Sequence, residues 1–309
     1  MGSEDHDLIA LGPFARLLRH TPAMAAPEEP SGTEARSGDT PNSVLGKVRL
    51  ILDSFGPDDT ALSLADVSRR SGIPKASVHR LIQEMIDWGV VERVGAEYRL
   101  GVRLYEYGSR VPLIRELRDN VRPFMSDLHK QVGETVNLGV LAGMDVLFVE
   151  RANGYRQQPR PARLGGRVPM HCSSTGKVLM AFGPETLLTH VLSQPLARMT
   201  RATNTSRSRL IEQVAKVREQ GFALDQEEVI TGFSGIAIPL FSTASQAIGA
   251  LSIVGPTYRV NFDKYLRALT ETRQRMSSAG ALPDGLVAAL ASLPARPAAT
   301  KQDDSITPV

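Results

Sequence analysis

The chain has 309 residues, of which 42% are hydrophobic and 22% charged, and its formal net charge is +3. This length predicts two domains with linkers, because one compact core seldom extends over so many residues. A membrane helix is excluded because no run approaches the ~18 apolar residues that it requires, and the single cysteine, Cys172, excludes an intramolecular disulfide framework. The acidic N-terminus lacks the order of a signal peptide, so we expect a cytoplasmic protein.

Residues 1–40 are rich in proline, alanine, glycine and glutamate and show no sustained apolar period. This composition predicts a disordered extension. Order begins near residue 41 with "NSVLGKVRLILDSF", which predicts a helix capped by Asn42 or Ser43. Its inward positions, at helical spacing, are Val44, Leu45, Val48, Leu52 and Phe55.

Two further helices follow closely. The segment "LSLADVSRRSG" predicts a short helix that ends at Gly72. A third helix is expected over 74–88, with Pro74 in its first turn, where the missing N–H costs nothing, and Gly89 at its end. Its buried stripe recurs at i, i+3, i+4, i+7 and i+8 and consists of Val78, Leu81, Ile82, Met85 and Ile86.

A β-hairpin comes next, with strands "VVERV" and "EYRLG" around a turn at Gly95 and Ala96. Three helices and a hairpin in this order are the plan of a winged helix-turn-helix domain, to which we assign residues 41–102. In this plan the third helix enters the DNA major groove and the hairpin contacts the phosphate backbone.

The charge distribution agrees with a nucleic-acid partner. Between residues 63 and 83 the basic side chains Arg69, Arg70, Lys75 and Arg80 face only Asp66, which predicts a local surface for an anion. A helix face that is merely solvated is the alternative. We predict base or phosphate contacts on the third helix and its surroundings, and phosphate contacts on the hairpin; the residues are Arg69, Lys75, Ser77, His79, Arg80, Gln83, Arg93 and Arg99.

Arg80 is the strongest candidate for a base contact, because a bidentate arginine–guanine pair gives ~1–3 kcal/mol of discrimination.

Residues 103–122 are predicted to form a linker helix, in a helical pattern that Pro112 and Pro123 interrupt. The apolar positions of this region can pack between subunits, onto the following sheet, or both; they are Leu113, Leu117, Val121, Phe124 and Leu128.

Residues 123–280 predict an α+β domain with an antiparallel sheet. "ETVNLGVLAG" alternates as a half-buried strand should, and "VLFVER" is its expected hairpin partner. Helices are expected at "SSTGKVLMAF", "PETLLTHVL", "SRSRLIEQVAKVREQG" and over 262–278, with strands at "FALDQE", "SGIAIPLFS" and "QAIGALSIVGP". The tail over 281–309 is predicted to be disordered.

Five stretches in this order resemble the IclR family of bacterial transcriptional regulators: "LSLADVSRRSGIPKASVHRLIQEMIDWGVVERVG", "GETVNLGVL", "GGRVPMHCSSTGKVLMA", "QGFALDQEEVITGF" and "ALSIVGPTYRV". The resemblance implies a winged helix, a connecting helix and a C-terminal GAF-like effector-binding domain. It also implies dimers or dimers of dimers on partly palindromic operators. Effectors of such proteins are typically small organic acids or aromatic metabolites.

Carried across by position, the resemblance places the effector site at Ser174, Thr175, Asp225, Phe233 and Gly235. Free N–H groups at a helix N-terminus, aided by hydroxyls, suit an anion there. Asp225 can accept a hydrogen bond from a hydroxyl or water, although an exposed turn is an equal alternative. Many relatives have cysteine where this chain has Gly235, which gives the hypothesis of a roomier site for a bulkier ligand.

Enzymatic interpretations find less support. Cys172 beside His171 lacks an identifiable orienting partner for a nucleophile, and "STGKV" lacks the glycine and hydroxyl residue of a phosphate-binding loop. The scattered histidines give no metal-ligand spacing. We therefore expect a DNA-binding regulator that is not an enzyme and needs no cofactor or metal. A C-terminal domain that serves only for assembly, or a small-molecule enzyme fused to a DNA-binding head, are the alternatives.

Overall fold

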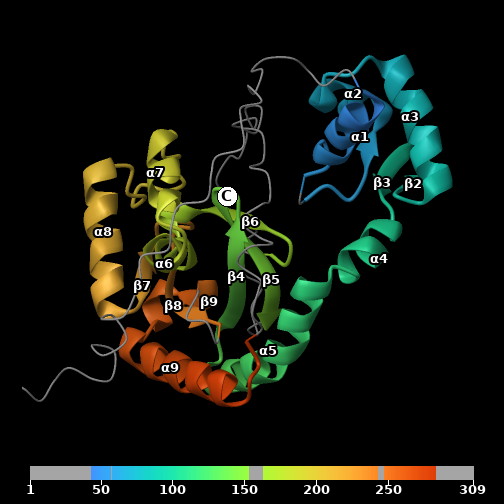
Figure 1. Cartoon of the computed structure of the whole chain (residues 1–309). Coiled ribbons are helices and arrows are strands. Elements are labelled where there is room, and N and C mark those ends of the chain that lie inside the picture. Colours follow the sequence, from blue (N-terminus) through green and yellow to red (C-terminus); the bar gives the residue numbers. More distant parts are fainter. Residues whose placement is uncertain (1–42, 57, 153–162, 243–246, 283–309) are drawn as a thin grey trace, which may run out of the picture. The chain divides into compact units, whose positions relative to one another are not determined.

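The computed structural model describes residues 43–56, 58–152, 163–242 and 247–282 (Figure 1). The disorder predicted for 1–40 and for most of the tail, and part of the loop before Arg167, lie outside these residues. At the tail, Ala281 and Leu282 are buried in a hydrophobic core, so the predicted boundary at 280 is too early.

The N-terminal domain contains the three predicted helices, α1 (Val44–Asp53), α2 (Leu64–Ser71) and α3 (Lys75–Trp88). Their ends follow the local sequence signals. Ser43 accepts a hydrogen bond from the Gly46 N–H at 3.0 Å, and Ser63 accepts one from the Asp66 N–H at 3.2 Å. Gly72 (φ 69°) ends α2 in the left-handed conformation that glycine adopts without strain.

The core of this domain lies between the helices and the hairpin. The predicted stripe of α3 is confirmed, with Val78, Leu81, Ile82 and Met85 buried and Ile86 half-buried against the same core. In α1 the prediction is wrong at the first turn, where Val44 is 56% and Leu45 81% exposed. The packed stripe of α1 begins one turn later and centres on Ile51, with Phe55 packed just beyond the helix end, so the first turn remains in solvent.

The wing consists of β2 (Val91–Val94) and β3 (Glu97–Leu100), paired antiparallel as predicted. A third strand, β1 (Leu62–Ser63), pairs with β3 and gives the order β1-β3-β2. The sequence prediction placed these two residues in the second helix. Leu62 pairs with Tyr98, and both are buried, so a long-range contact makes this short strand.

The predicted interruption of the linker region is correct only at Pro112. Helix α4 (Arg103–Ser109) ends just before this proline, where α5 (Pro112–Val132) begins, but α5 continues through Pro123 and through the predicted linker boundary at 122. A proline inside a helix costs about 3 kcal/mol. Burial of an apolar stripe against the following sheet offsets this cost; its residues are Leu117, Val121, Met125 and Leu128.

The C-terminal domain contains a six-stranded antiparallel sheet in the order β6-β5-β4-β9-β8-β7, which confirms the α+β class (Figure 1). Every neighbouring pair of strands is antiparallel. The strands are β4 (Thr135–Ala142), β5 (Asp145–Ala152), β6 (Arg167–Pro169), β7 (Ala223–Gln226), β8 (Phe233–Phe241) and β9 (Ala247–Pro256).

Helices cover both faces of this sheet. One core packs α5 and α9 (Phe262–Ser278) on the first face, and a second core packs α6 (Ser174–Phe182), α7 (Thr186–Ser193) and α8 (Arg207–Gln220) on the other (Figure 1). Strand β4 is therefore buried on both faces rather than half-buried as predicted. Within the part of the chain that the structure describes, no helix is both long and apolar enough to cross a membrane.

Candidate functional site

The outer face of α3 is polar and open to solvent. Lys75, His79, Arg80 and Gln83 are exposed, and Ser77 is half-buried near the helix start. The opposite side of the same helix is fixed in the core, so these five side chains share one surface. No side chain caps the N-terminus of α3, where Pro74 stands.

Two arginines of this region form ion pairs with carboxylates. The Arg80 Nη1 lies 3.0 Å from the Glu84 Oε1 on the same helix, and the Arg69 Nη2 lies 2.8 Å from the Asp66 Oδ1. A hydrogen bond from Ser63 and then one from Arg69 lower the pKa of Asp66. The guanidinium of Arg80 thus stays on the polar face of α3.

The wing carries the two other predicted basic contacts. Arg93 donates through Nε to the Gly95 carbonyl at 3.1 Å at the tip of the hairpin, and the Arg99 Nη2 lies 2.7 Å from the Glu92 Oε2. The hydrogen bond from Arg99 is the main cause that lowers the pKa of Glu92. Both arginines are exposed on the surface of the wing.

In the C-terminal domain, the first turn of α6 lies close against the sheet. Ser173 caps this helix by accepting from the Gly176 N–H at 3.0 Å, and Ser174 and Thr175 are buried. A Cβ at Gly176 would lie 2.3 Å from the main chain of Met170, so only glycine fits there. The "STG" sequence therefore follows from close packing of the helix entry.

Two sheet glycines allow this approach. A Cβ at Gly139 would lie 2.6 Å from the Thr175 Cγ2, and one at Gly235 would lie 3.4 Å from the Ser174 Oγ and 2.9 Å from the Val254 Cγ2. The space beside Gly235 is thus already taken by neighbouring side chains. The glycine lets helix and sheet approach each other, and the hypothesis of a roomier site for a bulkier ligand stays a prediction.

Asp225 and Phe233 lie on the same side of the sheet as Gly235. Asp225 pairs with Gly235 across β7 and β8, and Phe233 lies two residues before it on β8, where alternate side chains share a face. Four of the five predicted positions, Ser174, Thr175, Asp225 and Gly235, are buried, whereas Phe233 at the strand start is half-buried. The structure brings the predicted set to one region.

Asp225 is buried rather than part of an exposed turn. It accepts a hydrogen bond from the Glu228 N–H at 2.8 Å. Burial, and then the charge of Glu228, raise the pKa of Asp225 to about 7. At neutral pH this carboxyl group is therefore poised between its protonated and ionised forms.

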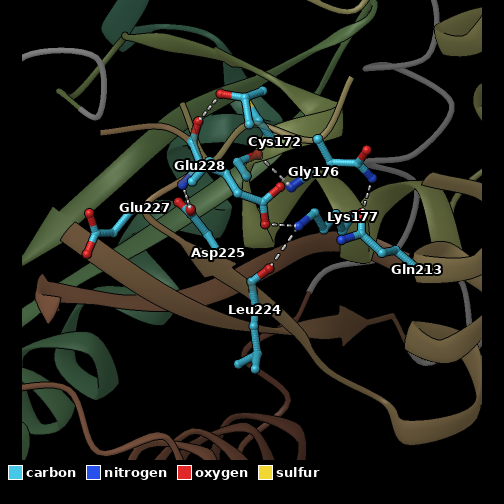
Figure 2. Close-up of polar contacts among 12 residues, drawn as sticks. Cys172, Gly176, Lys177, Gln213, Leu224, Asp225, Glu227 and Glu228 are labelled. Carbon is cyan, nitrogen blue, oxygen red and sulfur yellow. Dashed lines mark hydrogen bonds and ion pairs between the residues drawn. The ribbon is translucent and has the colours of Figure 1, made fainter. Parts of the chain in front are cut away.

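A buried ion pair that the sequence analysis missed lies beside Asp225 (Figure 2). The Lys177 Nζ donates to the Glu228 Oε1 and to the Leu224 carbonyl, the latter at 3.1 Å. Figure 2 shows Lys177 pointing toward Leu224 on β7 and toward Glu228 in the turn after this strand. Its only sequence signal is a lysine directly before the apolar run "VLMAF" of a helix.

The cysteine and the histidine beside it do not form a nucleophilic pair. His171 contacts the Ala197 carbonyl through Nε2 at 2.9 Å. Cys172 is fully buried, and burial raises the pKa of its thiol to about 12, so the thiol stays protonated at neutral pH. Across the described residues, no group of three or more histidine, cysteine or acidic side chains is placed to hold a metal ion.

The sequence also missed Asn137, on β4. Its side chain lies on the sheet face that α6 covers and is fully buried. A polar residue within the apolar run "TVNLGVLA" was the available signal.

Comparison with known proteins agrees with this arrangement. The family model for the C-terminal domain of the bacterial transcriptional regulator IclR matches residues 77–278, and the model for the IclR helix-turn-helix domain matches residues 44–95. The chain belongs to the IclR family. Both halves of the described fold, the winged helix and the sheet with its helices, lie within the matched residues.

Curated IclR-family relatives include regulators from Escherichia coli. The regulator XynR is 32% identical over 233 residues, which are 74% of this chain and 91% of that protein. The repressor IclR is 29% identical over 219 residues, 69% of this chain and 80% of that protein. A solved structure of an IclR homologue from Microbacterium hydrocarbonoxydans, in complex with 4-hydroxybenzoate, has a TM-score of 0.70 at 32% identity and covers 77% of this chain and 99% of its own.

Proposed function

We propose that this chain is a ligand-responsive regulator that binds double-stranded DNA in the cytoplasm and controls metabolic or catabolic genes. The exposed polar face of α3, fixed by its buried opposite face, is the observation that carries the proposal. A helix held in this way presents its side chains to base edges in the major groove. Cys172, the candidate nucleophile of the enzymatic alternative, is buried with its thiol protonated, which supports a role in binding.

We assign the proposed DNA contacts to bases or to phosphates by the position of each residue. Arg80 and Gln83 lie toward the middle of α3 and read bases, with Ser77 and His79 beside them. The other basic residues attract phosphates without sequence preference, and they are Arg69, Lys75, Arg93 and Arg99.

The effector site lies at the first turn of α6, where Ser174 and Thr175 meet the sheet beside Asp225, Phe233 and Gly235. A small organic acid or aromatic metabolite is the proposed effector class. The free N–H groups of a helix start favour a carboxylate, and the relative from Microbacterium holds 4-hydroxybenzoate. Binding would shift the equilibrium between forms that do and do not fit the operator.

The regulator works as a homodimer or a dimer of dimers on a partly palindromic operator. Large hydrophobic side chains on and near α4 are exposed to solvent, which supports this assembly. Tyr105 is 72% exposed, and Trp88, Val102 and Tyr107 are also exposed. Trp88 donates to the Tyr107 hydroxyl at 3.0 Å, which fixes the two rings as one surface. Exposed aromatic side chains of this kind are typical of protein interfaces.

Fluorescence anisotropy tests the proposal, with a duplex from the promoter next to the gene and a shuffled duplex of equal length. We expect the wild type to prefer the promoter, and Arg80→Ala to bring the ratio of the two affinities close to one with an unchanged thermal midpoint. Equal binding of both duplexes by the wild type, with and without a panel of organic acids, would contradict the proposal. Preference for the promoter without any response to the acids would instead favour a C-terminal domain that serves only for assembly.

A further inference from the structure

Asn137 places a polar amide group in the core of the C-terminal domain, where burial is energetically unfavourable. Its exposed fraction is 0%, and neither the Nδ2 nor the Oδ1 of its side chain has a hydrogen-bond partner among the described residues. Nearly all buried polar groups in proteins are hydrogen-bonded, because an unpaired one loses its hydration without compensation. An apolar residue of similar volume would suit a purely structural position better.

The side chain lies on the face of the sheet that α6 covers. Asn137 pairs with Ser252 on β9 and with Arg151 on β5, and residues that pair across a sheet share a face. Gly139, two residues further along β4, lies on that same face directly against Thr175. The unpaired amide thus belongs to the region proposed for the effector.

The neighbours of Asn137 define the chemistry of a partner. An asparagine amide offers two N–H donors and one carbonyl acceptor, so a hydroxyl group, which both donates and accepts, can satisfy both of its ends. The first turn of α6, which covers the same face of the sheet, has N–H groups that favour a carboxylate close by.

We propose that Asn137 is a specificity-determining residue of the effector site and selects organic acids that carry a hydroxyl group over their deoxy analogues. The hydroxyl bonds to the Asn137 amide, and the carboxylate lies toward the start of α6. This inference rests on the proposed effector site. It adds the reason for selection: a deoxy analogue leaves the buried amide unpaired, and sites built around a hydrogen bond reject such analogues strongly.

Isothermal titration calorimetry on the full chain tests it with two matched pairs, 4-hydroxybenzoate against benzoate and lactate against propionate. The variants are Asn137→Leu, which keeps the volume, and Asn137→Ala, which removes it. Thr272→Val is the matched control, because the Thr272 Oγ1 is also buried without a partner among the described residues, but on α9, which packs on the other face of the sheet. Thermal midpoints of all variants show that they are folded.

The wild type should bind one hydroxylated acid at least about tenfold more tightly than its deoxy partner. This ratio should fall close to one in both Asn137 variants and persist in Thr272→Val. If this affinity ratio persists in the Asn137 variants, the amide bonds to a bound water or serves only packing, and the inference is wrong. So would a wild type that prefers neither hydroxylated acid, or binds none of the four.

The DNA measurement separates this failure from a failure of the proposed function. If the wild type prefers its promoter and an acid changes that preference, the proposed function is supported and only the proposed role of Asn137 is wrong. If the wild type shows neither promoter preference nor acid binding, the proposed function itself is wrong.

Discussion

The guanidinium of Arg80 lies 3.0 Å from the carboxylate of Glu84, one turn further along the face of α3 that is open to solvent. Both side chains are well exposed, and an ion pair of this kind contributes at most about 1 kcal/mol. Breaking the pair therefore costs little free energy, and Arg80 can exchange the carboxylate of Glu84 for a guanine edge or a phosphate. Glu84 meanwhile brings a negative charge to a surface proposed to face DNA.

Glu84→Gln should strengthen DNA binding without a large effect on folding. Removal of this charge reduces repulsion from phosphates, and we expect affinity for both promoter and shuffled duplex to rise by roughly fivefold at low salt, equivalent to about 1 kcal/mol. Anisotropy titrations measure the affinities, and the gain should shrink as salt is added. Equal affinities of variant and wild type would place Glu84 away from the DNA.

Arg93→Ala should weaken binding to every duplex by the same factor. An arginine that contacts a phosphate adds a sequence-independent contribution, so its loss should make the slope of log affinity against log salt shallower by about 0.9. Arg267→Ala, at an exposed position on α9, is the control and should change neither affinity nor slope. A change in the promoter-to-shuffled ratio for Arg93→Ala would mean that the wing reads bases.

Lys177→Met should destabilise the C-terminal domain strongly. The substitution leaves the buried carboxylate of Glu228 without its ion-pair partner, for which we expect a loss of ~3–5 kcal/mol in the free energy of unfolding. The double variant Lys177→Met with Glu228→Leu should recover most of this loss, because no charge remains buried. Urea denaturation measures both; equal losses in the single and double variants would show that packing, not charge, dominates.

The sequence predicted what depends on local periodicity. The bounds of α9 and the buried positions Leu210, Val214 and Val217 of α8 agree with the structure, because one amphipathic stripe specifies each helix. The ion pair of Lys177 with Glu228 joins residues 51 positions apart, and the two-residue strand β1 depends on its partner β3. No local pattern records such pairings.

The candidate site was predictable in place but not in detail. The family resemblance located Ser174, Thr175, Asp225 and Gly235, which the structure brings together. The close approach of helix and sheet at Gly235, and the unpaired amide at Asn137, depend on which side chains meet across the two layers. Those contacts follow only from the packed fold.

Gly139→Ala should destabilise the same domain, because its Cβ would lie 2.6 Å from the Thr175 Cγ2 and 2.7 Å from the Val146 Cγ1. Overpacking of this kind costs about 1–3 kcal/mol. Gly108→Ala on α4 is the matched control, since nothing lies within 4 Å of its Cβ, and alanine should add about 0.5–1 kcal/mol there. Thermal denaturation of both variants gives the comparison; similar midpoints would contradict the tight contact.

Asp225→Asn should remove part of the pH dependence of stability. Burial raises the pKa of Asp225 from 3.8 to about 7, so between these values the unfolded chain ionises while the folded chain keeps its proton. Stability contributed by this group therefore falls as the pH rises from about 4 to about 7, by on the order of 4 kcal/mol. The asparagine cannot ionise but still accepts from the Glu228 N–H. Its thermal midpoint, relative to that of the wild type, should rise over this range and level off above it, whereas parallel profiles from pH 4 to 8 would show that Asp225 does not titrate there.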